Sequence, residues 1–364
     1  MQFRDITGLA DIKKTLVASV HKGHVAHAQL FHGTNGSATL PLALAYAAFI
    51  NCENKLPEDS CGRCAACTKI SKLAHPDFFN IYPTAGPKAS TENLMPKWRK
   101  FVAATPHGTL SQWLTSIEGK QGNISAEEAR NLIQKLSMKA YEASFKIVLI
   151  WQPEAMSIAA ANALLKVLEE PPSQTIFLLV TNKIDALLPT ILSRTQQIYI
   201  RQYTDNEIIN ILEIEGVENN KATKIAYLAN HDFNALPELK TDTELSHTDW
   251  FAGWMRLCYR ENYQKLVALA DEFDGFPKEK QKAVLELSLT IFRDLFLVRL
   301  GVNELIRQQG TDLKFVQDFA KAMNFSHFET IIELLSETHF HIERNARAKI
   351  AFLDISLKMT SLIR

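Results

Sequence analysis

The sequence has no excess of charge of either sign, because its 40 lysine and arginine residues equal its 40 aspartate and glutamate residues. Proteins that bind nucleic acid through their own surface usually carry a basic patch or a basic excess. The balance excludes a strongly basic nucleic-acid binder and leaves contacts with DNA that are local or shared with partner chains.

Long apolar runs are also missing. No stretch approaches the ~18 apolar residues that a membrane span needs, and the opening MQFRDITGLADIKKTL contains no apolar signal region. We therefore expect a cytoplasmic protein that makes no membrane contact. The length of 364 residues, with 46% hydrophobic and 22% charged, is typical of a globular chain with two or three domains.

Cysteine is scarce, with five residues, but four of them form the pattern C-x8-C-x2-C-x2-C. In a reducing compartment such a cluster favours metal over disulfides. Four thiolates suit zinc at about 2.3 Å and leave no open position for an activated water, so we predict a structural zinc site. Free buried thiols and a redox pair are the alternatives. The predicted ligands are Cys52, Cys61, Cys64 and Cys67, whereas Cys258 is expected in a helical core.

The first 200 residues alternate strand-like and helix-like segments, which predicts a parallel sheet covered by helices. KIVLIW and TIFLLV are nearly continuous apolar runs, as expected for strands buried on both faces. Ser157 is expected to cap the helix that follows the first of them, and Pro171 and Pro172 to end it. The predicted strands are Gln29 to His32, Phe78 to Tyr82, Ile147 to Trp151, Thr175 to Val180 and Gln197 to Ile200.

After residue 201 the strand signals fade, and from about 246 the pattern is helical to the end. The last helix is expected to place Ala346, Ile350, Leu353 and Leu357 on one face. We interpret that face as internal core, with a surface for oligomer contacts as the alternative.

Residues 83–123 interrupt the α/β pattern and predict an insertion with some helix. Within it, Trp98 stands beside Lys97, Arg99 and Lys100. An exposed tryptophan among basic residues can stack on a base, but our first interpretation is that Trp98 packs the insertion onto the body of the protein.

The stretch GTNGSATL, residues 33–40, partly matches the phosphate-binding pattern G-x-x-x-x-G-K-[ST]. Gly33 matches the first glycine of the pattern and Gly36 a fourth place that is commonly glycine too, whereas Ala38 stands at the second glycine of the pattern. Thr39 stands at the lysine position and Leu40 at the hydroxyl position. Thr39 offers no charge to a phosphate and Leu40 no oxygen to magnesium, so on its own the loop is a weak match.

The segment NALLKVLEEPPSQTIFLLVTNKIDALLPTILSRTQQI, together with HAQLFHG and the cysteine spacing, resembles the bacterial clamp-loader subunits of DNA polymerase III, in the AAA+ superfamily. The similarity covers residues 1 to about 240 well. It implies a RecA-like AAA+ domain (1–201, with the zinc module at 52–67 and the insertion at 83–123), a helical lid (202–243) and a helical collar for oligomerisation (246–364).

Within this family the ATP-hydrolysing motor subunits must be separated from the inactive delta prime type. Alignment through KIVLI and NALLK puts Trp151 and Gln152 where the motor has its Asp-Glu pair, and Asn234 where the lid has its arginine. The Asp-Glu pair and the lid arginine are therefore missing, as are the lysine and the hydroxyl of the phosphate-binding loop. The resemblance therefore implies a delta prime-like subunit without productive ATP or magnesium binding. Weak nucleotide binding by the loop backbone stays open.

Arg194, in LSRT, matches the arginine that clamp-loader subunits supply to a neighbour's ATP. Ser193 matches the preceding serine, and Thr195 replaces the usual cysteine. The resemblance implies an arginine finger acting in trans, and a structural salt bridge is the alternative.

The resemblance also implies partners. These are gamma/tau motor and delta subunits in a hetero-pentamer, and through them the sliding clamp and primer-template DNA at the bacterial replisome and nucleoid. The enzyme activity would then be that of the polymerase holoenzyme. The alternatives are an active motor with an atypical site and a zinc-bearing DNA-binding module unconnected to replication, which the net charge disfavours.

Overall fold

The computed structural model describes residues 1–86, 89–241, 247–308 and 310–364. Its contacts divide the chain into two compact units. The first comprises Met1–Gly216 with His231–Ala235, and the second comprises Val217–Asn230 with Leu236–Arg364. The three-domain division at residues 201 and 243 stays a prediction.

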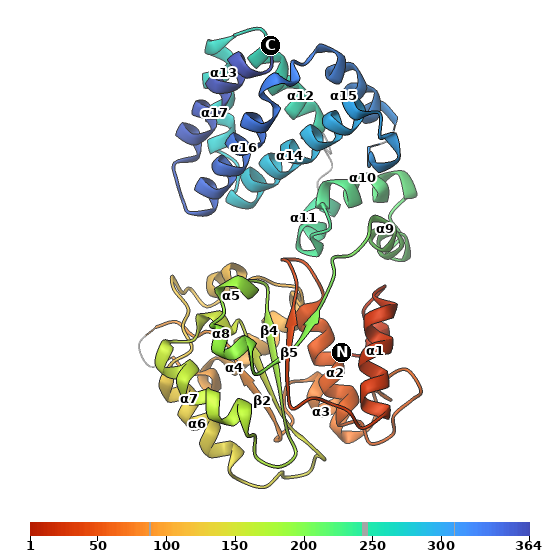
Figure 1. Ribbon diagram of the computed structural model, residues 1–364, viewed down its shortest axis with the longest axis vertical. Helices are drawn as coiled ribbons and strands as arrows, with labels where there is room; N and C mark the ends of the chain where they lie inside the picture. Colours follow the sequence, from red (N-terminus) through yellow and green to blue (C-terminus); the bar gives the residue numbers. More distant parts are fainter. Residues whose placement is uncertain (87–88, 242–246, 309) are drawn as a thin grey trace. The chain divides into compact units, whose positions relative to one another are not determined.

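The first unit is built around a parallel sheet with strand order β2-β3-β4-β1-β5 (Figure 1). All five predicted strands are confirmed within one residue at each end. Their bounds are β1 Ala28–His32, β2 Phe78–Ile81, β3 Lys146–Trp151, β4 Thr175–Thr181 and β5 Gln196–Tyr199.

Helices cover both faces of this sheet, with α6 and α7 on one side and α1 and α2 on the other (Figure 1). Every residue of β3 and β4 is buried, as their apolar runs predict. The Ser157 cap is confirmed, because its side chain accepts the N–H of Ala160. The helices are α1 Ala10–His21, α2 Thr39–Ile50, α3 Ala65–Ser71, α4 Thr91–Ala104, α5 Leu110–Ser116, α6 Ala126–Leu136, α7 Ile158–Glu169, α8 Pro189–Leu192 and α9 Asp205–Ile214.

In the described residues the second unit is helical, as predicted. Aromatic rings fill its core, with Phe273 and Phe352 stacked at 4.3 Å, and Cys258 lies in that core as expected. The helices are α10 Asn219–Ala229, α11 Leu236–Thr241, α12 His247–Tyr259, α13 Tyr263–Asp274, α14 Lys278–Leu300, α15 Gly310–Ala322, α16 Phe328–Glu343 and α17 Ala348–Leu362.

The core interpretation of the last helix is wrong for its predicted stripe. Ala346 precedes α17 and is exposed, Ile350 is 61% and Leu357 43% exposed, and only Leu353 is partly buried. The buried face of α17 is instead formed by Ala348, Phe352, Ile355 and Met359. The stripe therefore faces outward, as the alternative interpretation requires. Among the described helices none combines the length and the apolarity that a membrane crossing requires.

Candidate functional site

The phosphate-like loop connects β1 to α2, but residues 36–40 are buried in this structure. Thr39 and Leu40 each expose 2% of their surface. Gly36 has a φ of +77°, a left-handed conformation that glycine adopts without strain. Ser37 hydrogen-bonds back to the Thr34 carbonyl through its hydroxyl at 2.7 Å. The loop keeps the strand-to-helix turn, and its last two positions belong to the apolar interior.

Asn182, directly after β4, contacts the phosphate-like loop from the neighbouring strand. Its amide donates to the carbonyl of Thr34 at 2.8 Å, and its side-chain oxygen accepts from Gln152 at 3.4 Å. Sequence reasoning missed this residue. The available signal was a polar side chain directly after a buried strand, since parallel strands end at the same edge of a sheet.

Trp151 and Gln152 lie together at the carboxyl end of β3 and are 1% and 4% exposed. The Trp151 ring packs against Trp98 at 5.0 Å and Phe101 at 5.9 Å. An ionised carboxylate at position 151 would be buried among rings, which costs free energy, whereas the Trp151 ring packs there.

Trp98 is fully buried and stacks on Tyr82 at 4.4 Å. This confirms the interpretation that it packs the insertion onto the body, and it leaves no ring face for a nucleic-acid base. The insertion contains α4 and α5 and is further held where the Trp113 indole donates to the Pro83 carbonyl at 2.7 Å.

Glu154 is a second residue that sequence reasoning missed. It lies in the turn after β3, where one carboxylate oxygen accepts from the Thr181 hydroxyl at 2.8 Å. Its other oxygen has no hydrogen-bond partner in the described residues. Burial raises the pKa of Glu154 above its ordinary value. It is therefore a carboxylate near the expected magnesium position, displaced by two residues.

Asn234 lies in a short 3-10 turn, Phe233–Ala235. Asp232 and Phe233 lie against the phosphate-like loop. A Cβ atom at Gly36 would lie 2.6 Å from the Phe233 nitrogen and 2.7 Å from the Asp232 Cα. The Asn234 N–H donates to the Asp232 carboxylate at 2.8 Å. The structure thus brings the segment that carries Asn234 to the loop, with a neutral side chain where the arginine was expected.

Arg194 follows α8 and is partly exposed. Its Nε donates to the Glu169 carboxylate at 3.0 Å, and its Nη1 to the Thr190 carbonyl at 3.1 Å. The Ser193 hydroxyl also lies 3.4 Å from Nη1. Glu169 is 60% exposed, and such ion pairs are worth about 0–1 kcal/mol. Arg194 therefore has a salt bridge, but one weak enough to exchange for a stronger anion.

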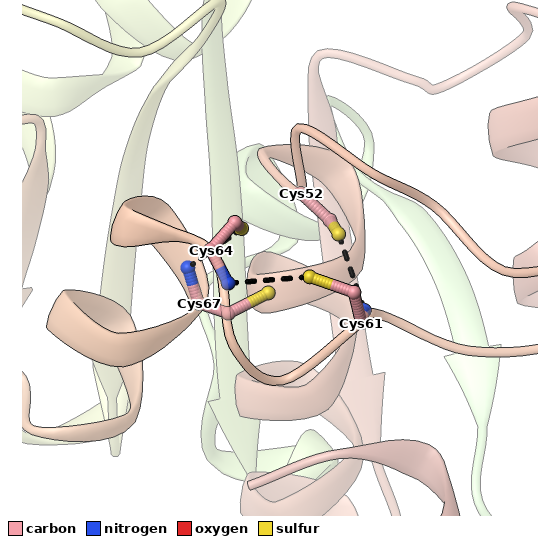
Figure 2. Close-up of side chains that lie close together, drawn as sticks. All are labelled: Cys52, Cys61, Cys64 and Cys67. Carbon is pink, nitrogen blue, oxygen red and sulfur yellow. Dashed lines mark hydrogen bonds between the residues drawn. The ribbon is translucent and has the colours of Figure 1, made fainter.

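The four cysteines converge at the start of α3 (Figure 2), with all their sulfur atoms within 4.8 Å of one another. A tetrahedral zinc with bonds of about 2.3 Å needs edges of about 3.8 Å, which this arrangement approaches. Backbone N–H groups point at the sulfurs, from Cys61 to Cys52 at 3.2 Å and from Cys64 to Cys61 at 3.3 Å. All four are free thiols, so the residues fit a zinc ion, which would be structural because four thiolates complete its shell.

The thiols of the cluster differ in proton affinity. N–H groups of Arg63 and Cys64 lower the pKa of Cys61 to about 6. Burial raises the pKa of Cys67 and of Cys52. A bound divalent cation deprotonates its thiol ligands outright, so with metal bound all four cysteines would be thiolates despite their different pKa values.

Two carboxylates fasten the chain's first residues to this unit. Asp59, in the cysteine module, accepts the backbone N–H groups of Phe3 and Arg4, each at 3.0 Å. Glu207, in α9, accepts the N–H of Leu9 at 3.0 Å and both arms of the Arg201 guanidinium. Arg201 lowers the pKa of Glu207 to about 2.

Comparison with known proteins places the chain among replication proteins. The family model described as DNA polymerase III, delta subunit, matches residues 8–204. The delta' subunit of Bacillus subtilis DNA polymerase III is 24% identical over 95% of both chains. The delta' subunit of Pseudomonas aeruginosa is 31% identical, over 47% of this chain and 42% of its own.

The tau subunit of B. subtilis is 28% identical over 57% of this chain, but the aligned part is only 30% of tau. The chain thus spans nearly the whole of one delta' relative and less than half of the tau relative. Among solved structures, a gamma subunit-related protein of Thermotoga maritima aligns with 97% of this chain at 16% identity and a TM-score of 0.39.

Proposed function

The chain belongs to the DNA polymerase III delta subunit family, and from this premise we propose that it has the delta prime role, as a clamp-loader subunit that does not hydrolyse ATP. The near full-length similarity to a delta' subunit supports the role. Similarity to tau over 57% of this chain does not separate the two types, so the chemistry of the site carries the proposal.

The observation that carries it is the burial of uncharged side chains at four positions of the loop and of the end of β3, where ATP hydrolysis needs a cation, a metal-binding hydroxyl and carboxylates. Thr39, Leu40 and Trp151 are 1–2% exposed and packed, and Gln152 bonds a neighbouring amide. Phosphoryl transfer depends on positioned cations and a metal-holding carboxylate. A site without them binds neither magnesium nor the developing negative charge.

In this proposal Arg194 completes the ATP site of a motor neighbour. A planar guanidinium pairs with two oxygens of a phosphate at once, and an arginine finger is worth ~10³–10⁵ in rate. The weak ion pair with Glu169 is small beside that gain. Gamma/tau and delta subunits would be the partners, and the assembly would load the sliding clamp on primed DNA. The module at 52–67 would hold structural zinc.

The test of the finger is reconstitution with motor and clamp-opening subunits. We expect Arg194→Ala to assemble normally and to lose at least tenfold of the DNA-stimulated ATPase rate. Glu169→Ala separates the two roles of Arg194, because it breaks the salt bridge and leaves the guanidinium. A finger predicts near normal ATPase for Glu169→Ala, whereas a structural salt bridge predicts equal losses in both variants. Arg130→Ala, an exposed arginine of α6, is the control.

An active motor with an atypical site is the second candidate, and Glu154 is the observation that favours it. One of its carboxylate oxygens has no hydrogen-bond partner in the described residues, and it lies near the expected metal position. Purified chain alone decides the matter. Turnover of ATP that is abolished in Glu154→Gln would establish the motor type, and we expect no turnover above background.

A further inference from the structure

The segment His231–Ala235 is attached to the first unit although the chain on both sides of it belongs to the second. Asn230 and His231 have φ values of +44° and +68°. Two successive left-handed residues turn the chain sharply at the end of α10. The turn delivers the backbone of Asp232 and Phe233 to Gly36 of the phosphate-like loop.

The approach of this segment to the loop leaves no room for a side chain between them. A methyl group at Gly36 would lie 2.6 Å from the Phe233 nitrogen, closer than Cβ atoms come to other atoms. Gly36 is accordingly buried, whereas Thr34 and Asn35 earlier in the loop are exposed. The segment therefore contacts the loop at Gly36.

Phe233 is held from the other side by rings that come from distant parts of the sequence. His107, from the 83–123 insertion, stacks on Phe233 with ring centroids 4.2 Å apart. Tyr203, which precedes α9, packs on Phe233 at 5.2 Å, and its hydroxyl lies 3.1 Å from the His107 Nε2. We call these three residues, His107, Tyr203 and Phe233, the ring latch.

The insertion at residues 83–123 supplies one ring of the latch. The buried tryptophans of the insertion anchor α4 and α5 on the sheet, which places the turn between these helices, and His107 with it, beside Phe233. At the lysine and hydroxyl positions of the loop stand Thr39 and Leu40, both buried.

We propose that the ring latch holds the segment His231–Ala235 against the phosphate-like loop in the absence of nucleotide, so that His107 is a positioning residue and the insertion closes the site with protein. The inference rests on the proposed function in one respect, since it takes the site as one that nucleotide does not fill. It concerns the loop and its cover, and is independent of the Arg194 assignment.

Hydrogen exchange of the full chain, followed by mass spectrometry of peptides, tests the latch. In His107→Ala we expect exchange to be about 2- to 10-fold faster in peptides covering 30–42 and 228–238, the range that loss of one ring stack produces. His107→Phe keeps the stack and should restore nearly normal exchange. His341→Ala is the matched control, because His341 contacts Phe340 in the second unit.

Unchanged exchange of both peptides in His107→Ala would overturn the latch. If that variant is unfolded, Tyr203→Phe, which loses only the hydroxyl partner of His107, should still raise exchange at 228–238, and the absence of that rise would count against the proposal. Slower exchange of peptide 30–42 in the wild type with magnesium and ATP would also overturn it. Arg194→Ala can lose the neighbour's ATPase whichever result the latch experiment yields, so the two proposals fail separately.

Discussion

At the scale of single residues, Leu40 in the loop and Trp151 at the end of β3 have packing roles where the family resemblance implies polar or charged side chains. Leu40 lies in the interior at the hydroxyl position, and Trp151 joins an aromatic cluster at a carboxylate position. These side chains stabilise the fold through packing, and in the proposed function the same positions no longer serve ATP hydrolysis. A carboxylate at position 151 would lie among aromatic neighbours.

Replacing Trp151 tests this packing role. We expect Trp151→Ala to destabilise the first unit by about 3–5 kcal/mol, because a large buried side chain leaves a cavity. Trp151→Phe keeps most of the ring contacts and should cost less. Urea unfolding measures the difference, and equal stability of Trp151→Ala and wild type would contradict the buried position.

Glu207 shows how one carboxylate joins two segments, and its effect depends on pH. Its folded pKa of about 2 lies below the ordinary value of about 4.3. A lowered carboxyl pKa stabilises the fold fully above the unfolded pKa, and the effect is lost as pH falls through the folded pKa.

Glu207→Gln removes this charge and should reduce stability by about 1–3 kcal/mol at pH 7. The gap to wild type should be smaller at pH 3.5, because part of the charge effect has then disappeared. Urea unfolding at both pH values measures it. Glu170→Gln, at an exposed position after α7, is the control, and a gap that widens on acidification would show that the sign is wrong.

At the scale of elements, the cysteine module and the insertion are two additions to the α/β unit that are held in place by different interactions. The buried cluster of the module consists of Cys52, Cys64, Ala66 and Cys67, and the proposed zinc would stabilise it by joining its thiolates. The insertion is held by aromatic packing on the sheet. The cysteine module could be predicted from the spacing of its cysteines. The ring partners of Trp98 could not be predicted, because no local pattern says that it meets Trp113 and Trp151.

Removing one thiolate should empty the module of metal. We expect wild type purified under reducing conditions to contain one equivalent of zinc, and Cys64→Ser to contain much less. Exchange should also rise in peptides covering residues 1–9, because Asp59 of the module holds Phe3 and Arg4. Cys258→Ser is the matched control, since Cys258 lies in the core of the second unit. Zinc retained at one equivalent in Cys64→Ser would refute the four-thiolate site.

At the scale of the whole molecule, the two units use apolar residues differently. The first buries its apolar runs on both faces of a sheet, whereas the second leaves an apolar stripe of α17 exposed, with Ile350 and Leu357 outward. If the protein is a subunit of a hetero-oligomer, as proposed, this stripe is a surface for its neighbours.

A charged residue on the stripe should therefore weaken assembly and leave the fold intact. We expect Ile350→Asp to retain the thermal stability of the isolated chain and to reduce its incorporation into the reconstituted complex at least severalfold, measured by mass photometry. Ser361→Asp adds the same charge at an exposed polar position of α17 and should incorporate normally. Full incorporation of Ile350→Asp would place the neighbours elsewhere.

The sequence by itself determined the parallel sheet, the cysteine cluster and the absence of charge at the loop, because period, spacing and residue type are local properties. The tertiary structure alone decided which face of α17 is buried, which rings Trp98 packs against, and that Asn182 and Glu154 lie at the same sheet edge. It also decided that His107 meets Phe233 over the loop. These are contacts between segments far apart in the chain, and their energies depend on how helices and strands pack, which no single segment encodes.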